Sequence, residues 1–428
     1  MAAIREACGA YCEQGPPNSG DEVIETCLYI TNGIIGIISP PCHLLHSLDP
    51  FLSRANIFTY TDAMSTKRVE RSATHAGSWY LRDKTSLDHQ LTDFLGNVPA
   101  ASFEHGPLPV PDARIIIAPH AGYSYSGPTA AWAYKSWDVS KIERVFLLGP
   151  SHHVYLSNCA VSQCTEYQTP LGNIPIDTKT IDELSKTGKF QKMSKAADED
   201  EHSLEMHLPY IYKILSESEG GMRPLVPVMV GALSTHSERE FGELLSPYLA
   251  DPKNGFIIST DFCHWGTRFG YTNYVDDADC ENVRSINSSS YFSPSSHARG
   301  SLNPEVPIYK SIEIMDYKGM DVSNGGSHAE WTEYLARTKN TICGRHPLGV
   351  LIAGIEYLRN KGVELALDQR RPVPGTGPAE VVAKENLTGE EALKYRFGKI
   401  YWVQYKQSSH CKNLSDSSVS YASGFAKA

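Results

Sequence analysis

The amino-acid sequence predicts an α/β fold in which a mostly parallel central sheet carries helices on both faces. From about residue 113, short apolar runs alternate with helical patterns of apolar residues. The runs are too short for helices and are apolar throughout, which is typical of strands buried on both faces. The composition, with 41% hydrophobic and 21% charged residues, is that of a globular chain that buries a core.

The predicted elements follow one another in a regular order. Strands are expected over 114–118, 144–148, 224–230 and 256–259. Helices are expected over 177–190, 234–249 and 348–358. Gly188 is expected to end the first of these helices, and Pro128 fits the first turn of another helix that follows the first strand. Because parallel strands need crossover connections, this alternation favours a covered parallel sheet.

The chain is expected to contain an N-terminal extension and one larger domain. Residues 1–63 show no sustained period and precede a second methionine, Met64, so we expect a poorly ordered extension. Residues 64–428 are expected to form one α/β domain. Stretches rich in serine, proline or glycine near 287–307 and 370–398 predict surface insertions in it.

Charge and cysteine usage exclude several classes of protein. Lys plus Arg (39) against Asp plus Glu (49) gives a net charge of −10, which argues against general nucleic-acid binding. No apolar run reaches the length of a membrane span, and no basic leader precedes an apolar stretch. The ten cysteines include no Cys-x-x-Cys pair, which favours a reducing compartment. We expect a location in the cytoplasm, with the nucleus as a further location to be considered.

Polar side chains follow the predicted strands at one end. His120 follows the strand over 114–118, His152 follows the next strand, and Asp261 and His264 follow the strand over 256–259. The carboxyl ends of parallel strands meet in one crevice, so these side chains are expected to converge. Cys343 lies just before the last predicted helix, which we expect to begin near Pro347, where the helix dipole favours a thiolate.

These residues fit a transition-metal site. His120, His152 and Cys343 would supply two imidazoles and a thiolate, with positions left open for water or a substrate. Asp261 is expected to orient an imidazole, and His264 to move protons. A binding crevice without metal would use the same topology, with each histidine hydrogen-bonded at a strand end. The residues alone leave both alternatives open.

Several neighbouring residues carry weaker signals. His153 is expected to point away from the site as a supporting or surface residue, and Cys263 to serve packing. His202 and His207 lie in a segment that superficially resembles a zincin helix, but they are five residues apart instead of four, which excludes the metalloprotease motif. His202 could pair with Glu205 on a helix face, and a structural role for His207 is at least as well supported. Phosphate-binding glycine loops and a Gly-x-Ser-x-Gly elbow are absent from the sequence, so no nucleotide cofactor is expected.

Seven short motifs resemble those of the Memo family, which is named from a mediator of receptor-tyrosine-kinase-driven cell motility. They occur in the family's order, and the resemblance covers about 74–362, apart from the serine-rich insert, and 399–424. The motifs span 74–80, 118–125, 149–154, 198–210, 261–266, 341–347 and 416–422.

The resemblance implies a fold and a ligand set. The family is similar in fold to class III extradiol dioxygenases, whose iron is held by two histidines and a carboxylate. By that correspondence His120 and His152 match the histidine ligands, Cys343 takes the place of the carboxylate, and His264 matches the acid–base position. Because a thiolate alters metal preference and redox potential, dioxygenase chemistry ranks last among the functions considered.

The resemblance also implies a function. It points to a copper- or iron-binding protein with redox activity and a role in signalling or cell motility, and whether it turns over a substrate is left open. A pocket for a phosphotyrosine-containing peptide or a signalling protein is implied as well, with Trp79 and Tyr125 as walls and Arg268 as the anion partner. The rival hypothesis is a non-enzymatic binding module that uses the same crevice. Core packing is the alternative explanation for the two aromatic residues.

Overall fold

The computed structural model describes residues 27–31, 34–38, 68–99, 106–287, 302–361 and 397–428. The chain divides into two units, Met1–Thr66 and Lys67–Ala428. In the first unit, β1 (Cys27–Thr31) and β2 (Ile34–Ile38) form an antiparallel hairpin. Most of the expected extension over 1–63, and most of both expected insertions, lie outside the described residues, so the domain organisation stays a prediction.

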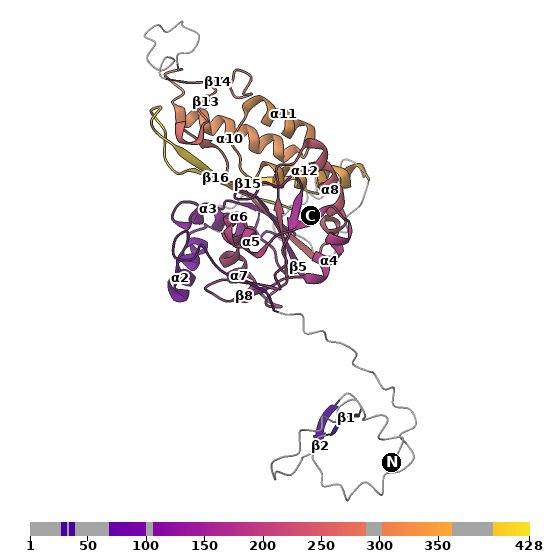
Figure 1. Cartoon of the computed structure of the whole chain (residues 1–428). Coiled ribbons are helices and arrows are strands. Elements are labelled where there is room, and N and C mark those ends of the chain that lie inside the picture. Colours follow the sequence, from indigo (N-terminus) through magenta and orange to yellow (C-terminus); the bar gives the residue numbers. More distant parts are fainter. Residues whose placement is uncertain (1–26, 32–33, 39–67, 100–105, 288–301, 362–396) are drawn as a thin grey trace, which may run out of the picture. The chain divides into compact units, whose positions relative to one another are not determined.

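A large sheet organises the second unit (Figure 1). Its four central strands lie in the order β4-β11-β5-β10, and neighbouring strands in this group are parallel. They are β4 (Ile115–Ala118), β5 (Arg144–Pro150), β10 (Leu225–Val230) and β11 (Asn254–Ser259). Every residue of β4, β10 and β11 is buried, because side chains on both faces are covered. The α/β class is confirmed, and each predicted strand is present.

Antiparallel strands extend this sheet at both edges, so the parallel part is smaller than predicted. On one side β16 pairs antiparallel with β4, β12 and β15; on the other, β6 is antiparallel to β10 and parallel to β9. An antiparallel pair needs no crossover helix, so a C-terminal hairpin can join the edge directly. These strands are β6 (Cys159–Val161), β9 (Phe190–Lys192), β12 (His264–Trp265), β15 (Ile400–Gln407) and β16 (Ser418–Ala426).

Two small sheets contain the other strands of the second unit among the residues that the structure describes. One has the order β3-β7-β8 and the other pairs β13 with β14. Their bounds are β3 (Glu70–Arg71), β7 (Glu166–Gln168), β8 (Asn173–Pro175), β13 (Asn273–Tyr274) and β14 (Arg284–Ser285).

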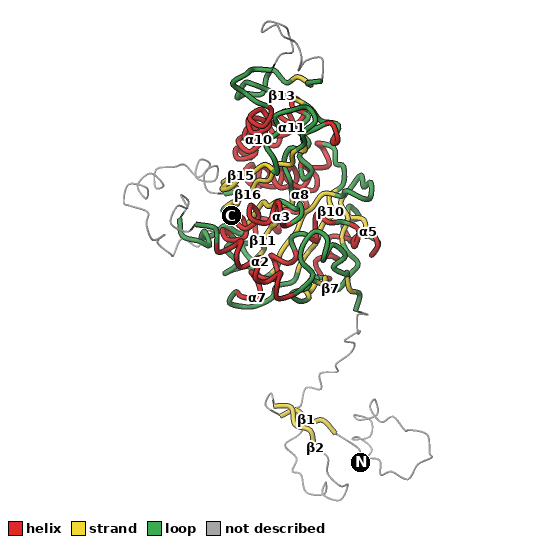
Figure 2. Tube along the Cα trace, turned by 90° about the vertical axis from the view of Figure 1, so that its left-hand side faces the viewer, coloured by secondary structure: helices red, strands yellow, loops and turns green. Residues whose placement is uncertain are grey.

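Helices cover both faces of the large sheet (Figures 1 and 2). On one face α8 (Thr235–Ala250) and α12 (Arg345–Asn360) pack together against β11; on the other, α3 (Tyr123–Ser136) packs against β4 and β16 and is itself covered by α2 (Lys84–Gly96). The close approach of α8 and α12 requires Gly242, where an added Cβ would lie 2.6 Å from the backbone nitrogen of Gly354. The other helices are α4 (Thr178–Lys186), α5 (Lys195–Asp200), α6 (His202–Glu205), α7 (Leu208–Glu217), α10 (Ile308–Gly325), α11 (His328–Thr338) and the 3₁₀ helix η3 (Thr267–Phe269).

The predicted helices are present with shifted ends. Ser234 caps α8 by accepting a hydrogen bond from a backbone N–H in its first turn, and Gly188, at φ +72°, follows the end of α4 as predicted. The helix α12 begins at Arg345, two residues earlier than expected. The helix α3 begins at Tyr123, so Pro128 lies inside it and not in its first turn. Among the described residues, no helix combines the length and apolarity needed to cross a bilayer.

Candidate metal centre

Three adjacent parallel strands deliver the predicted site residues to one edge of the sheet. The strand β4 leads to His120, β5 leads to His152, and β11 leads to Asp261. Cys343 arrives from a distant part of the chain, directly before Gly344, the residue that precedes α12. The structure therefore brings these side chains together by the topology on which the prediction depended.

His120 is buried and is held in one tautomer. Its Nδ1 lies 2.6 Å from the hydroxyl of Ser259, and that hydroxyl donates to the carbonyl of Ser203 at 2.8 Å. Because the hydroxyl proton is already used, Nδ1 carries the hydrogen and donates to Ser259. Burial, followed by the nearby His152, keeps the pKa of His120 well below its ordinary value. A neutral imidazole therefore presents its Nε2 lone pair, 3.2 Å from the sulfur of Cys343.

His152 is oriented by a buried carboxylate. Its Nδ1 lies 2.9 Å from Oε1 of Glu201, and its backbone N–H donates to Oε2 at 2.6 Å. Burial raises the pKa of Glu201, but its hydrogen bonds with His152 outweigh burial and hold the pKa at about 2. The ionised carboxylate fixes the hydrogen on Nδ1 and leaves Nε2 of His152 free, the arrangement that metal-binding histidines commonly have.

Cys343 is a neutral thiol, which differs from the expected thiolate. Burial, followed by the charge of Asp261, raises its pKa well above the ordinary value. Backbone N–H groups of Asp261 and Gly344 act in the opposite direction, and the first of them lies 3.2 Å from the sulfur. Burial thus raises the pKa of Cys343 more than the backbone N–H groups near the start of α12 lower it. A nearby cation would shift the balance toward the thiolate.

Asp261 anchors the backbone of His120 and not its ring. Its expected role, to orient an imidazole, is therefore taken by another residue at His120. Its Oδ1 accepts a hydrogen bond from the backbone N–H of His120 at 2.9 Å, whereas the ring is held by Ser259. The hydrogen-bond acceptor that holds the ring of His120 is therefore the hydroxyl of Ser259, at the end of β11. Burial raises the pKa of Asp261 to about 7, so this carboxyl changes protonation near neutral pH.

His264 lies on β12 with its ring fixed at one nitrogen. Its Nδ1 lies 2.9 Å from the carbonyl of Phe262 and 3.2 Å from that of Thr341, so it donates there and leaves Nε2 free. Burial lowers the pKa of His264 despite these carbonyls, and the charge of His152 lowers it further. A neutral imidazole with a free nitrogen suits the expected acid–base role, which stays a prediction.

Two groups of potential ligand atoms lie at this edge and share His120. In one, the ligand atoms of His120, Asp261 and Cys343 lie within 4.8 Å of one another; in the other, those of His120, His152 and His202 do. The predicted set of His120, His152 and Cys343 is thus divided between the two groups. His202 is the residue that sequence reasoning missed, because its helix is a single turn and gives no periodic signal.

The remaining histidines of this region differ in burial. His153 is exposed, with its ring centre 5.8 Å from that of His202, as expected of a surface or supporting residue. His207 is buried, and its Nδ1 lies 2.7 Å from the hydroxyl of Tyr134, which supports the structural role. Cys263 is also buried, in a second cluster of core residues, as its predicted packing role requires.

Glu205 does not serve as the partner of His202. It accepts hydrogen bonds from Arg71 Nη1 at 2.7 Å, from His75 Nδ1 at 2.8 Å and from the hydroxyl of Tyr80 at 2.8 Å. Burial raises the pKa of Glu205, but the hydrogen bond of His75 and the charge of Arg71 hold it at about 2. The expected helix-face pair is therefore replaced by a buried network that joins β3 to α6.

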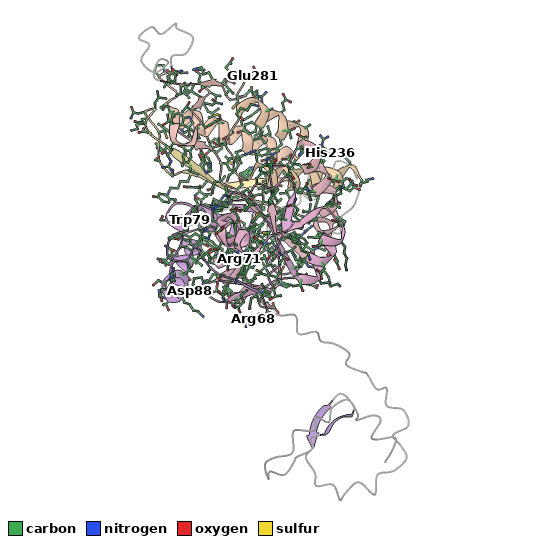
Figure 3. All side chains as sticks on the ribbon, viewed as in Figure 1. Arg68, Arg71, Trp79, Asp88, His236 and Glu281 are labelled. Atoms are coloured by element: carbon green, nitrogen blue, oxygen red, sulfur yellow. The ribbon has the colours of Figure 1, made fainter. Side chains whose placement is uncertain are left out.

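The three residues expected to bind a ligand line one cavity. Trp79, Tyr125 and Arg268 border a space of about 550 Å³ that Ala121 and Gly122, the residues directly after His120, also line. Trp79 and Tyr125 are 37% and 59% exposed, so neither is a core residue; Trp79 is labelled in Figure 3. The Arg268 guanidinium lies 4.4 Å from the ring centre of Phe269.

Serine residues form much of the remaining wall of this cavity. They are Ser78, Ser124, Ser408, Ser409, Ser417 and Ser418. Hydroxyls and a guanidinium are groups that donate hydrogen bonds to anionic oxygens.

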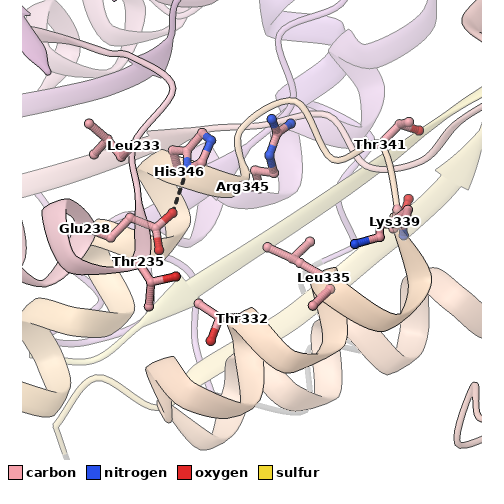
Figure 4. A pocket seen from close by; sticks show the side chains of 11 residues that line it. Leu233, Thr235, Glu238, Thr332, Leu335, Lys339, Thr341, Arg345 and His346 are labelled. Carbon is pink, nitrogen blue, oxygen red and sulfur yellow. Dashed lines mark hydrogen bonds and ion pairs between the residues drawn. The ribbon is translucent and has the colours of Figure 1, made fainter. Parts of the chain in front are cut away.

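A second cavity borders the Cys343 loop (Figure 4). It measures about 410 Å³, and Thr341 and Arg345, on either side of Cys343, both line it. Within it Glu238 lies 2.6 Å from Nδ1 of His346 and, on its other oxygen, 2.6 Å from Nε2 of His328. This carboxylate ties α8 to the first turn of α12 and so fixes the position from which Cys343 reaches the site.

An α/β chain with imidazoles, a thiol and a carboxyl gathered at the carboxyl edge of its sheet is a candidate metal-binding protein. Residues 71–425 match the sequence profile of a family described as Memo-like protein. The zebrafish (Danio rerio) and human proteins named Protein MEMO1 are 43% and 42% identical to the chain over 361 residues, covering 84% of this chain and 98% of each relative. The Caenorhabditis elegans Protein memo-1 homolog is 36% identical over 354 residues, covering 83% of this chain and 81% of its own. The chain belongs to the Memo family.

Proposed function

We propose that this chain is a metal-binding protein that holds copper or iron with His120, His152 and Cys343, beside Asp261 and His264. The observation that carries the proposal is the 3.2 Å separation of His120 Nε2 from the sulfur of Cys343, two residues 223 positions apart in the sequence. Such convergence of an imidazole and a thiol is expected of ligands to a borderline or soft transition metal.

The donors suit these metals in their protonation as well as their position. His120 and His152 each have Nδ1 engaged by an acceptor, so each offers Nε2 as a ligand. The Cys343 thiol loses its proton when a cation binds, and the backbone N–H of Asp261, 3.2 Å from the sulfur, donates a hydrogen bond that stabilises the thiolate.

A bound copper or iron ion supplies one-electron chemistry, and the residues around it determine what that chemistry does. We propose that His264 exchanges protons with the site, because its Nδ1 is fixed by two carbonyls while Nε2 stays free. We further propose that sulfur from Cys343 sets the reduction potential, since thiolate donors stabilise the softer, reduced ion.

Metal analysis tests this proposal. Full-length protein purified without an affinity tag is loaded with copper or iron, dialysed and assayed for bound metal, beside His120→Ala, Cys343→Ser and a control, His236→Ala, in which an exposed histidine on α8 is removed. We expect the control to match the wild type, His120→Ala to lose the ion, and Cys343→Ser to lose affinity for copper(I). Wild-type metal content and affinity in all variants would refute the proposal.

A second function is favoured by the cavity of about 550 Å³ beside the site. Trp79, Tyr125 and Arg268 line it, and a phosphotyrosine side chain needs an aromatic wall and a guanidinium. We propose that this cavity binds a phosphorylated peptide or signalling protein, which would make binding rather than turnover the output of this surface.

Titration calorimetry separates this function from the first. We expect a tyrosine-phosphorylated peptide to bind more tightly than its unphosphorylated form, and Arg268→Gln to remove most of the difference while leaving metal content unchanged. Lys339→Gln, which removes a cation from the other cavity, is the control. Equal affinities for the two peptides would exclude the anion pocket.

A further inference from the structure

We infer that His202 is a metal ligand and that His120, His152 and His202 form an all-imidazole site which binds a divalent transition-metal ion without Cys343. This inference rests on the proposed metal-binding function and extends it to a second ligand set. It assigns a role to a residue whose sequence context, an interrupted zincin-like segment, gave none.

The first support is geometric. One ring nitrogen from each of the three histidines lies within 4.8 Å of the others. The ring of His202 stacks on that of His152, with centres 4.4 Å apart and planes 24° apart, and its centre lies 5.5 Å from that of His120. Three imidazole nitrogens around one point, with further positions open, match the protein ligand set of many zinc and copper sites.

The second support is an unsatisfied polar atom. Nδ1 of His202 is buried and makes no hydrogen bond; Oε1 of Glu201, which is already bonded to His152, lies 3.5 Å from it. Buried ring nitrogens normally have partners, so one without a partner in a cluster of histidines points to a ligand. The other two members already have their second nitrogens occupied, by Ser259 and Glu201.

The surroundings hold the ring of His202 in place for this role. It is the first residue of α6, whose start is fixed because Glu201 accepts from the backbone N–H of Ser203 at 2.9 Å. The Ser203 hydroxyl donates to the carbonyl of Pro150 at the end of β5 at 2.7 Å, next to the loop that carries His152. Trp79 covers the ring, with centres 4.5 Å apart.

The two ligand groups are alternatives for an ion, because both use His120 and its Nε2 binds one ion at a time. The group with Cys343 contains sulfur and favours soft ions such as copper(I). The group with His202 contains only nitrogen and favours borderline divalent ions. Removal of the thiol should therefore leave a divalent site intact, whereas removal of His202 in that background should abolish it.

Cobalt(II) is the probe for this inference, because its visible spectrum distinguishes thiolate from imidazole ligation. Full-length Cys343→Ser is titrated with cobalt(II) beside the double variants Cys343→Ser/His202→Gln and Cys343→Ser/His153→Gln. The last is a matched control that removes the adjacent exposed histidine. We expect Cys343→Ser and the control to bind with d–d bands and no sulfur charge-transfer band, and His202→Gln to weaken binding at least about tenfold.

A second measurement covers the case in which His202→Gln disturbs the fold. X-ray absorption on cobalt-loaded Cys343→Ser, which retains His202, should show three imidazole neighbours, and fewer than three would overturn the inference. Equal cobalt affinity with and without His202 would overturn it as well. If wild-type protein and Cys343→Ser both bind no copper, iron or cobalt, the proposed function fails with it; if the wild type binds metal and His202 has no effect, this inference alone fails.

Discussion

Hydrogen bonds to Nδ1 prepare the histidines of this site as ligands. Ser259 holds the ring of His120 and Glu201 holds that of His152, each at 2.9 Å or less. In both cases the far nitrogen carries no hydrogen and lies within 4.8 Å of other potential ligand atoms of the cluster. A metal ion would therefore meet imidazoles that need no tautomer change.

The contribution of Ser259 can be measured. Ser259→Ala removes the acceptor that keeps hydrogen on Nδ1 of His120. We expect metal affinity to fall about 10–100-fold, as is common for residues that orient a metal ligand. Calorimetric titration with zinc(II) measures the change, and Ser136→Ala, which removes a buried hydroxyl on α3, serves as the control. Unchanged affinity in Ser259→Ala would show that the hydroxyl does not matter.

The depressed pKa of Glu201 makes the unfolding free energy depend on pH. The hydrogen bonds of His152 hold its pKa at about 2 against burial, below the ordinary 4.5. A depressed pKa means that its stabilisation is full above pH 4.5 and is lost as the pH falls toward 2. We expect Glu201→Gln to lose on the order of 2 kcal/mol of unfolding free energy at pH 7 and less at pH 3, measured by urea unfolding.

The matched control for this prediction is Glu333→Gln, whose side chain is 74% exposed. It should follow the wild type at every pH. A loss in Glu201→Gln that is the same at pH 3 and pH 7 would contradict the assigned pKa.

At the scale of elements, the Cys343 loop reaches the site because it lies directly against the end of β11. Gly344 donates its backbone N–H to the hydroxyl of Thr260 at 3.1 Å. An added Cβ at Gly344 would collide with the side chain of Thr260 and the carbonyl of Ser259. The distance between Cys343 and His120 therefore depends on a glycine at the start of α12.

Gly344→Ala tests this dependence. We expect a loss of about 1–3 kcal/mol of unfolding free energy from overpacking, together with weaker copper(I) binding, because the loop must move away from His120. Gly96→Ala is the control, since a Cβ there would meet no atom within 4 Å. Thermal unfolding and metal titration of both variants measure these effects. The account would be contradicted if Gly344→Ala behaved like the control.

Arg71 joins β3 to the segment that carries His202. It is fully buried and pairs with Asp198 at 3.0 Å and with Glu205 at 2.7 Å. Removing one partner of a buried ion pair leaves an uncompensated charge, so Arg71→Met should cost about 3–5 kcal/mol. The exposed pairs of Arg68 should contribute no more than about 1 kcal/mol, so Arg68→Ala is the control. Equal denaturation midpoints for the two variants would refute this difference.

At the scale of the whole molecule, the sequence predicted the parallel centre of the fold and not its edges. The strands β4, β5, β10 and β11 are continuous apolar runs, which composition reveals directly. The strands β15 and β16 are partly polar, and they pair with each other and with the sheet across long sequence separations that no local period encodes. The helices α10 and α11, which follow an expected insertion, were not predicted either.

The positions of several candidate site residues followed from the parallel centre of the sheet, whereas the neighbours that hold them did not. Topology alone was sufficient to bring His120, His152 and Asp261 to one edge, because carboxyl ends of parallel strands converge. The role of Ser259 was not predicted, because it depends on which side chain lies within hydrogen-bonding distance of the His120 ring. His202 was missed because it lies on a single helical turn, whose position is set by Glu201 and Ser203 and not by a periodic pattern.

Anomalous X-ray diffraction from crystals of the full-length chain loaded with copper or iron tests the central claim most directly. The account predicts one strong peak at the absorption edge of the metal, about 2.0–2.3 Å from Nε2 of His120 and from its other ligands, among which Cys343 supplies sulfur to copper(I). A peak elsewhere in the molecule, or none in a crystal that elemental analysis shows to be loaded, would contradict it.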